Sequence, residues 1–266
     1  IIMLSNKFRV NYSVGAVANG VKTDTFTFFL LFFYSNIIGL NPGLAGSAIF
    51  IALCIDAITD PLMGTISDRT NSSFGRRHPY MFISFIPMSL GYILLFAPRQ
   101  EWDMSQTDLF LWMTIFTVIT RIGMTLFDIP HRAFGGEVTK DYKERTILMS
   151  WREMFAWVAG LSNAFLGYGV FFASTPEFPQ GQLNPDVWFP FALTGAAIMV
   201  FSVLYSSLST KDEINSLSKW SGAISLIDIL YELKIAIGSK SFLIFFFGNL
   251  FLSLAWGLSN TLTLFV

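Results

Sequence analysis

The sequence predicts an all-α membrane protein. Apolar residues make up 53% of its 266 residues and charged residues only 13%, which is far from the usage of soluble domains. Mean hydropathy is +0.56, and the apolar residues gather in long stretches. The formal net charge of -1 gives no reason to expect a nucleic-acid partner. The single cysteine, Cys54, excludes an internal disulfide and a multi-cysteine metal site.

Seven apolar stretches are long enough to cross a hydrocarbon core of about 30 Å as helices. The first and the fifth contain glycine and polar residues, so we expect them to be tilted or bent. The stretches cover residues 12–40, 43–66, 80–97, 109–134, 147–173, 188–208 and 241–266.

Lys and Arg are unevenly divided between the connections. With the N-terminus in the cytoplasm, 13 of the 17 fall in cytoplasmic segments and Arg99 alone falls outside, while Lys22, Arg121 and Arg152 lie within spans. Basic connections favour the cytoplasmic side. The sequence therefore predicts a multi-pass protein with a cytoplasmic N-terminus. We expect its membrane to be a bacterial inner (plasma) membrane, which the charge count does not itself indicate.

The stretches group into three parts. We expect a six-helix transmembrane bundle over residues 1–209, a cytoplasmic loop over 210–240 and a seventh transmembrane helix over 241–266. Apolar residues recur every three or four positions in the loop, which predicts an amphipathic helix on the membrane surface. They are Leu226, Ile229, Leu230, Leu233 and Ile237.

The ends of the sequence suggest a longer protein. The chain begins with Ile1 rather than Met, and Val266 falls within an apolar run. We expect it to be a fragment, with further transmembrane helices following.

Two carboxylates interrupt the second stretch. Asp56 and Asp60 are four residues apart and share one helical face. Each costs roughly 2.5–3.5 kcal/mol at a bilayer centre, so such residues indicate function. A structural ion pair with Arg121 or Arg152 is the alternative.

The connection after the second stretch has its own pattern. It resembles the loop motif of major facilitators, in which glycine allows close helix approach and Asp and Arg hold helix ends together. The alternative is a basic anchor that happens to contain glycine. Six spans, a long connection and a seventh span likewise resemble the middle of a twelve-helix facilitator, whose halves rock about a central site. The loop residues are Gly64, Asp68, Arg69, Gly75, Arg76 and Arg77.

Four segments resemble one facilitator family more closely. The segments at residues 56–61, 125–130, 136–146 and 150–156 are similar to the glycoside-pentoside-hexuronide:cation symporters, which include melibiose permease-like proteins. The resemblance covers nearly the whole chain. It implies an N-terminal half plus helix seven of a transporter that couples cation movement to uptake of a sugar, glycoside or uronic acid. It implies no enzyme activity and no cofactor besides the coupling ion, Na+ or H+.

The resemblance also implies a cation site formed by Asp56, Asp60 and Thr125, which would be the metal site if the ion is Na+. Two carboxylates and a hydroxyl suit Na+, and two neighbouring carboxylates also suit proton uptake. Because Pro61 lacks an N–H, the Ala57 carbonyl is a further possible ligand. Thr59 replaces an Asn of the permease pattern, which leaves the ion open.

For the solute, the resemblance implies Asp128 and Arg152 as binding groups, with Asn19 at a position where the pattern has Lys. Met124 and Arg132 also depart from it, so the solute stays open, and the extra arginines suit an acidic one. We assign charge balance to three further residues. They are Arg121, Lys22 and Asp24. For Lys22 and Asp24, which are two positions apart and do not share a helical face, structural pairing with neighbouring residues is the alternative.

A second pattern comes from periodicity alone. Arg121, Thr125, Asp128 and Arg132 follow one another at intervals of four, three and four, which forms one polar stripe along the fourth stretch. Asp128 can face Asp60 from this stripe.

Other functions fit parts of the pattern. An intramembrane aspartyl enzyme would also use two carboxylates, but it usually places them on separate helices, and no HExxH, GxSxG or phosphate-loop motif is present. A facilitator for a lipid-like solute, or a homologue that senses without transporting, keeps the same fold. The expected partners are a small polar solute, membrane lipid and the C-terminal half of the same transporter.

Overall fold

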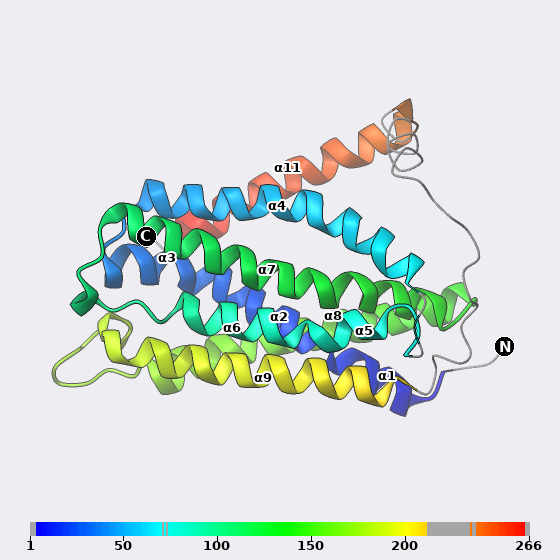
Figure 1. The fold of residues 1–266 in the computed structure, drawn as a ribbon, viewed down its shortest axis with the longest axis horizontal. Helices are drawn as coiled ribbons and strands as arrows, with labels where there is room; N and C mark the ends of the chain where they lie inside the picture. The colour runs from blue at the N-terminus through cyan, green and yellow to red at the C-terminus, as the bar shows by residue number, and fades with distance from the viewer. Residues whose placement is uncertain (1–3, 71, 73, 212–234, 236–237, 264–266) are drawn as a thin grey trace. The chain divides into compact units, whose positions relative to one another are not determined.

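The computed structural model describes residues 4–70, 72, 74–211, 235 and 238–263. Within these residues the secondary structure is helical and contains no strand, as the composition predicts. The chain divides into two units, residues 1–218 and 219–266. Helices of the first unit run side by side along one direction (Figure 1).

The first stretch is helical from Asn6 but irregular. The side chain of Ser5 caps α1 by accepting a hydrogen bond from the amide of Phe8, and Gly39 ends the segment with φ 87°. Two π-helical segments interrupt the later part, which agrees with the expected bend because π turns are a common cause of kinks. The elements are α1 (Asn6–Val14), α2 (Ala16–Asp24), η1 (Thr25–Phe29), α3 (Leu30–Phe32) and η2 (Phe33–Ile38).

Three long helices start at side-chain caps. Asn41 caps α4, Ser105 caps α7 and Asp141 caps α8, each by accepting from a backbone amide of the first turn. The helix α8 continues into a π-helical segment, so the fifth stretch is also irregular. The bounds are α4 (Pro42–Arg69), α7 (Gln106–Glu137), α8 (Tyr142–Leu166) and η4 (Gly167–Phe171).

The remaining helices of the first unit are shorter. A single residue, Ser84, separates α5 (His78–Ile83) from α6 (Phe85–Leu95), so the two form one segment. The helix α9 covers Trp188–Ser209. Short 3-10 turns η3, η5 and η6 lie in the connections, at Gln100–Trp102, Gly181–Leu183 and Pro185–Val187.

Glycine lets several of these helices approach closely. A methyl group at Gly20 would overlap the backbone carbonyl of Ala156, and one at Gly123 would overlap the backbone of Met88. These contacts join α2 to α8 and α7 to α6. Beyond them, α7 packs on α4 and α5, and α9 packs on α1, α2, α5 and α6.

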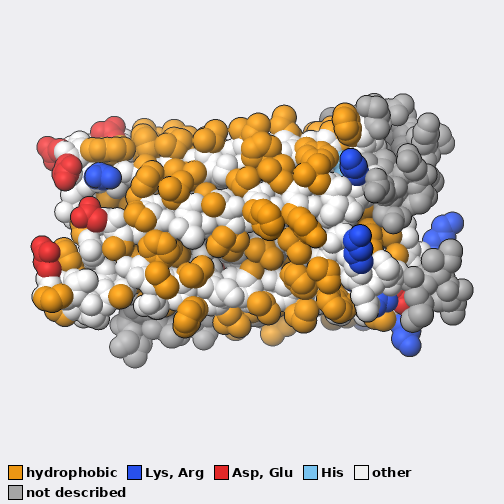
Figure 2. Space-filling view, turned by 90° about the horizontal axis from the view of Figure 1, so that it is seen from below, with side chains coloured by type: hydrophobic (Ala, Val, Ile, Leu, Met, Phe, Trp, Pro, Cys, Tyr) orange, Lys and Arg blue, Asp and Glu red, His pale blue; other side chains and the backbone are white. Residues whose placement is uncertain are grey.

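The outer surface of the first unit is apolar. Large side chains such as Phe50 on α4 and Phe165 on α8 are 66% and 73% exposed. Figure 2 shows apolar side chains over the middle of one face, with Lys and Arg at one end and mainly Asp and Glu at the other. A wide apolar belt between charged ends is what a bilayer requires. The protein is an integral multi-pass membrane protein.

Five described helical segments are long and apolar enough to cross a membrane, and they match the second to sixth predicted stretches. The first stretch is helical but is not among them, since it carries Lys22, Asp24 and other polar residues. The five segments are Pro42–Arg69, His78–Leu95, Gln106–Glu137, Tyr142–Phe171 and Pro185–Ser209.

The second unit contains α11 (Lys240–Thr263), whose apolar part is Lys240–Ala255. This helix coincides with the predicted seventh stretch. The apolar positions of the predicted amphipathic helix, Leu226 to Ile237, lie outside the described residues, so that helix stays a prediction.

Candidate functional site

A cavity of about 80 Å³ lies between α2, α4 and α7 and collects most of the residues predicted for the cation, the solute and charge balance. It is close to the middle of α4 and α7 in sequence, away from the helix ends. Three acidic and two basic side chains face a space large enough for a few water molecules or an ion. Its lining residues are Asn19, Lys22, Asp56, Asp60, Arg121, Met124, Thr125, Asp128 and Ile129.

Asp56 forms an ion pair with Arg121. The guanidinium Nε and Nη2 lie 2.6 and 2.5 Å from the same carboxylate oxygen, Oδ2. The other oxygen, Oδ1, is buried and has no hydrogen-bond partner in the described part of the chain. Arg121 therefore contacts Asp56 directly, which is the pairing that the sequence left as an alternative. The charge-balancing role of Arg121 and the cation role of Asp56 stay predictions.

Asp60 lies one turn further along α4, and no arginine pairs with it among the described residues. Its Oδ1 accepts a hydrogen bond from the Thr125 hydroxyl at 2.7 Å. The hydroxyl of Thr59 is buried beside this face without a hydrogen-bond partner among the residues described. Asp60 and Thr125, two of the predicted cation ligands, thus contact each other across α4 and α7.

The described residues contain no group of three His, Cys, Asp or Glu side chains that could hold a metal. A cation between Asp56 and Asp60 would therefore depend on hydroxyl and carbonyl oxygens to complete its shell. Thr125 supplies a hydroxyl at the cavity, and Pro61 inside α4 cannot donate to the Ala57 carbonyl. The Thr59 hydroxyl has no hydrogen-bond partner in the described residues, but Thr59 is not among the residues that line the cavity. This ligand chemistry fits Na+, which prefers oxygen ligands.

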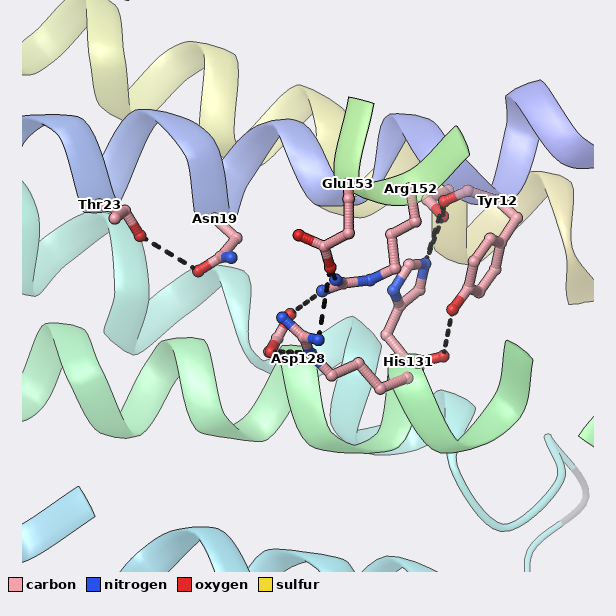
Figure 3. A network of polar contacts seen from close by, with 9 residues as sticks. Tyr12, Asn19, Thr23, Asp128, His131, Arg152 and Glu153 are labelled. Carbon is pink, nitrogen blue, oxygen red and sulfur yellow. Dashed lines mark hydrogen bonds and ion pairs between the residues drawn. The ribbon is translucent and has the colours of Figure 1, made fainter. Parts of the chain in front are cut away.

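Asp128 and Arg152 bind each other. The Arg152 guanidinium is fully buried and donates from Nη2 to Oδ1 of Asp128 and from Nη1 to Glu153 Oε1 at 2.7 Å. Arg132 Nε donates to the second Asp128 oxygen at 2.7 Å. Figure 3 shows Arg152 pointing from α8 toward Asp128 on α7, with Glu153 beside it. Both oxygens of Asp128 are therefore occupied by guanidinium groups.

Beside this network, α1 and α7 are joined by a pair of hydrogen bonds. The Tyr12 hydroxyl donates to the backbone carbonyl of His131 at 3.1 Å, and His131 Nε2 lies 3.0 Å from the carbonyl oxygen of Tyr12 (Figure 3). Both side chains are fully buried. They hold α1 against the helix that carries Asp128.

We refer to the linked charges as the charge cluster. It contains four basic and four acidic side chains. Each of them lines the cavity, contacts Asp128 or, in the case of Glu153, contacts the two arginines that bind Asp128. The members are Lys22, Arg121, Arg132, Arg152, Asp56, Asp60, Asp128 and Glu153.

Two predicted site residues of α2 face the cavity, and one does not. Asn19 and Lys22 line the cavity, and Lys22 Nζ also lies 5.9 Å from the ring centroid of Phe26. Asp24 instead accepts a hydrogen bond from Asn163 of α8 at 2.7 Å. The assignment of Asp24 to charge balance at the site is wrong, because a residue two positions from Lys22 points to the other side of the helix.

The predicted loop residues form a second set of contacts, at the ends of three helices. Arg77 lies 2.6 Å from Asp68 at the end of α4 and 2.5 Å from Glu137 at the end of α7. Arg76 also reaches Glu137 at 2.5 Å. We call Asp68, Arg76, Arg77 and Glu137 the latch. It supports the interpretation of this motif as a helix-end clasp.

The other loop residues play unequal parts. Gly75 has φ 76°, a left-handed conformation that favours glycine. Gly64 is not needed for close packing, because an added methyl would meet Ile129 at an ordinary 3.7 Å. Arg69 is exposed. The expected close approach at Gly64 is thus wrong for this structure, since α4 passes α7 there with room for a side chain.

Sequence reasoning missed Glu137 and Asn163 and used Thr59 only to discuss the ion. Glu137 was detectable in principle as an acidic residue at the basic end of the bundle. Asn163 is a polar residue in an apolar stretch and is nearly fully buried. No sequence signal distinguishes Thr59 from threonines that bond to their own helix backbone.

Comparisons with known proteins agree with this architecture. The family described as MFS/sugar transport protein matches residues 11–266. The inner membrane symporter YicJ of Escherichia coli (strain K12) is 30% identical over 164 residues, which cover 62% of this chain and 35% of that protein. Two uncharacterised symporters are similar over longer regions.

The first, sll1374 of Synechocystis sp., is 31% identical over 211 residues, 77% of this chain and 37% of its own length. The second, YnaJ of Bacillus subtilis (strain 168), is 30% identical over 235 residues, 85% of this chain and 48% of its own length. The chain spans between about a third and half of the length of these relatives. Its motifs, helices and buried charges, together with a family match over nearly all of its length, show that the chain belongs to the MFS/sugar transport family, whose members are transporters and not enzymes.

Proposed function

We propose that the protein is a secondary active symporter, which couples inward movement of Na+ or H+ to uptake of a polar solute by alternating access. The solute class that best fits is a sugar, glycoside or uronic acid. The observation that carries the proposal is the cavity between α2, α4 and α7, where Asp56, Asp60 and Asp128 converge within membrane-spanning helices.

The cost of burying these charges supports a transport role. Ionisable side chains inside membrane helices are expensive and usually mark ion or substrate pathways. Arginine pairing accounts for Asp56 and Asp128. Asp60 has only the neutral Thr125 as its hydrogen-bond partner in the described residues, so its charge is the one best placed to receive a cation.

In this proposal the cation binds between Asp56, Asp60 and Thr125, with the Thr59 hydroxyl as a further ligand. The Oδ1 of Asp56 and the Thr59 hydroxyl are buried and have no hydrogen-bond partner in the part of the chain that the structure describes. A cation would supply the interaction that they lack. Protonation of one carboxylate is the corresponding step if the coupling ion is H+.

The solute would contact Asp128, Arg152 and Asn19. A carboxylate accepts hydrogen bonds from sugar hydroxyls, and a guanidinium donates through a planar fork. Because guanidinium groups occupy both oxygens of Asp128, a solute must share or replace those contacts. Breaking the contacts between Asp128 and the guanidinium groups costs free energy and so lowers the net affinity for the solute. Solutes that hydrogen-bond to both Asp128 and Arg152 are therefore favoured.

Names of relatives support this class of solute. YagG of Escherichia coli (strain K12), 30% identical over 159 residues, is named a putative glycoside/cation symporter. A second protein of that organism, 25% identical over 163 residues, is named a glucuronide carrier protein homolog. A relative from Danio rerio, 28% identical over 174 residues, is named a sodium-dependent lysophosphatidylcholine symporter, so a lipid-like solute is an outcome that the test must distinguish.

We place the protein in a bacterial inner membrane, with its N-terminus on the cytoplasmic side. The latch then lies on the cytoplasmic side, at the end of the bundle where the basic connections gather (Figure 2). The residues that follow this chain in the full-length transporter would form the second half of the wall around the cavity.

The test is uptake of radiolabelled solutes by the full-length protein in proteoliposomes, under an imposed sodium or proton gradient. We expect gradient-driven accumulation of a sugar, glycoside or uronic acid. Neutralising either carboxylate, Asp56→Asn or Asp60→Asn, should abolish the stimulation by the ion while leaving membrane insertion intact, because the ligand charge is lost.

Asp186→Asn is the matched control, since Asp186 is exposed in a connection far from the cavity residues in sequence. It should accumulate solute like the parent protein. Equal ion stimulation in the parent, Asp56→Asn and Asp60→Asn proteins would reject the cation site. If lysophospholipid were accumulated and no sugar were, the proposed solute class would be wrong and the symport mechanism would stand.

A further inference from the structure

The geometry points to Arg121 as an exchangeable partner that couples the cation to an anionic solute. In this structure its guanidinium holds Asp56. When both ligands bind, the guanidinium transfers to the carboxylate of the solute and the cation takes its place at Asp56. This inference rests on the proposed symport function and narrows the solute to a monoanion, such as a uronic acid or its glycoside.

The first observation is how Arg121 binds Asp56. Two of its N–H groups meet the same oxygen, at 2.6 and 2.5 Å, and the other oxygen has no partner in the described residues. The side chains are only 15% and 19% exposed. The pair joins α7 to α4 at the cavity wall, so its release would free both a guanidinium and a carboxylate toward the cavity.

The second observation is that the ion pair and a bound cation compete. A cation requires the negative charge of Asp56, and the guanidinium already neutralises it. A cation placed between Asp56 and Asp60 while Arg121 remained would also be repelled by it, in surroundings that screen charge poorly. The cation therefore binds best when Arg121 has another partner.

The third observation is the charge balance. With their ordinary charges at neutral pH, the four basic and four acidic members of the charge cluster cancel. One monovalent cation with a neutral solute would leave an uncompensated positive charge inside the bilayer, which is costly. One cation with a monoanionic solute keeps the cluster neutral.

Arg121 is the arginine best placed for this exchange. Arg152 is fully buried and divided between Asp128 and Glu153, and Arg132 is shared between the same two carboxylates. Arg121 lines the cavity and has Asp56 as its one ion-pair partner among the described residues. Lys22 lines the same cavity without an ion pair in the described chain, so it can attract the anion before the exchange.

The first arm of the test needs no solute. Sodium binding to the purified full-length protein is measured by isothermal titration calorimetry, for the parent and for Arg121→Gln, Arg121→Lys and Lys22→Gln. We expect Arg121→Gln to raise the sodium affinity about tenfold, because the competitor is gone, a size typical of couplings between sites. Lys22→Gln removes an equal charge from the cavity without freeing Asp56, so its effect should be much smaller.

The second arm compares methyl β-glucuronide with methyl β-glucoside, which differ by a carboxylate. In the parent, the glucuronide should raise sodium affinity about tenfold and the glucoside should not. Arg121→Gln should lose this linkage, and Arg121→Lys, which keeps an exchangeable charge, should retain most of it. Thermal unfolding of each variant checks that it is folded.

The two proposals fail in different ways. The exchange role alone would be overturned if Arg121→Gln lowered sodium affinity. It would also be overturned if the glucuronide raised sodium affinity as much in Arg121→Gln as in the parent. If the glucoside raised sodium affinity as much as the glucuronide does, the proposal that the solute is an anion would be overturned. If no solute changes sodium affinity in the parent, and none is accumulated under a sodium or proton gradient, the symport proposal fails together with this inference.

Discussion

The latch and the charge cluster use the same chemistry in different surroundings. Both join helices through arginine and carboxylate groups, and both involve α4 and α7. The latch lies at helix ends, where Asp68 is 42% and Glu137 28% exposed, whereas Arg152 in the cluster is fully buried and Asp56 is 19% exposed. Near water such a pair mainly fastens helices, and inside the bundle it also determines which charged ligands can bind.

The largest difference should appear when a buried arginine is removed. We expect Arg152→Ala to reduce the free energy of unfolding by about 3–5 kcal/mol, because Asp128 and Glu153 lose their buried partner. Solute affinity should fall while sodium affinity changes little. Thermal unfolding and calorimetric titrations measure these effects.

Arg132→Ala is the matched control, since it removes an arginine from the same Asp128 where the side chain is 45% exposed. Its cost should be about 1 kcal/mol or less. If Arg152→Ala and Arg132→Ala lost equal free energy of unfolding, burial would not distinguish the contacts that the two arginines make with Asp128.

The next effect concerns a hydroxyl at the cavity. Thr125→Val keeps the shape of the side chain but removes the donor to Asp60 and one proposed cation ligand. We expect sodium affinity to fall about tenfold, which corresponds to roughly 1.4 kcal/mol. Sodium titration of the purified protein measures it.

Thr114→Val makes the same change on the same helix, at a hydroxyl that donates to the backbone carbonyl of Phe110 and does not line the cavity. It should leave sodium affinity unchanged. A similar fall in both variants would mean that Thr125 acts through helix stability and not as a ligand.

A smaller effect should separate the two arginines of the latch. Arg77 contacts both Asp68 and Glu137 and is 5% exposed, whereas Arg76 contacts Glu137 and is 13% exposed. We expect Arg77→Gln to lower the free energy of unfolding by about 1–2 kcal/mol, and Arg76→Gln by less than half of that. Both should retain sodium binding. Thermal unfolding in detergent ranks the two, and the reverse order would contradict the assigned contacts.

The smallest effect is a difference in salt sensitivity. Raising ionic strength from about 0.1 to 1 M with choline chloride shortens the Debye length from about 10 to 3 Å. The stability lost in Arg77→Gln should shrink at high salt, because ions reach the latch. The loss in Arg152→Ala should persist, and a parallel decrease in both would show that solvent ions reach the cluster too.

Much of the fold was predictable because membrane helices follow local rules. Apolar length places the second to sixth spans, and the predicted bends of the first and fifth stretches coincide with π-helical segments. The site was predictable in part. Asp56, Asp60, Thr125 and Asp128 line one cavity as expected, but the sequence pattern also assigned Asp24 to the site, which faces Asn163 instead.

The sequence alone determined that this chain forms membrane helices, that several carry charges within the bilayer, and that basic residues gather in the connections on one side. These properties depend on composition and on helical periodicity, which each segment expresses by itself. Only the tertiary structure decided that Arg121 binds Asp56 and that Arg152 binds Asp128. Such choices depend on how each helix is rotated against its neighbours, and packing between distant segments sets that rotation.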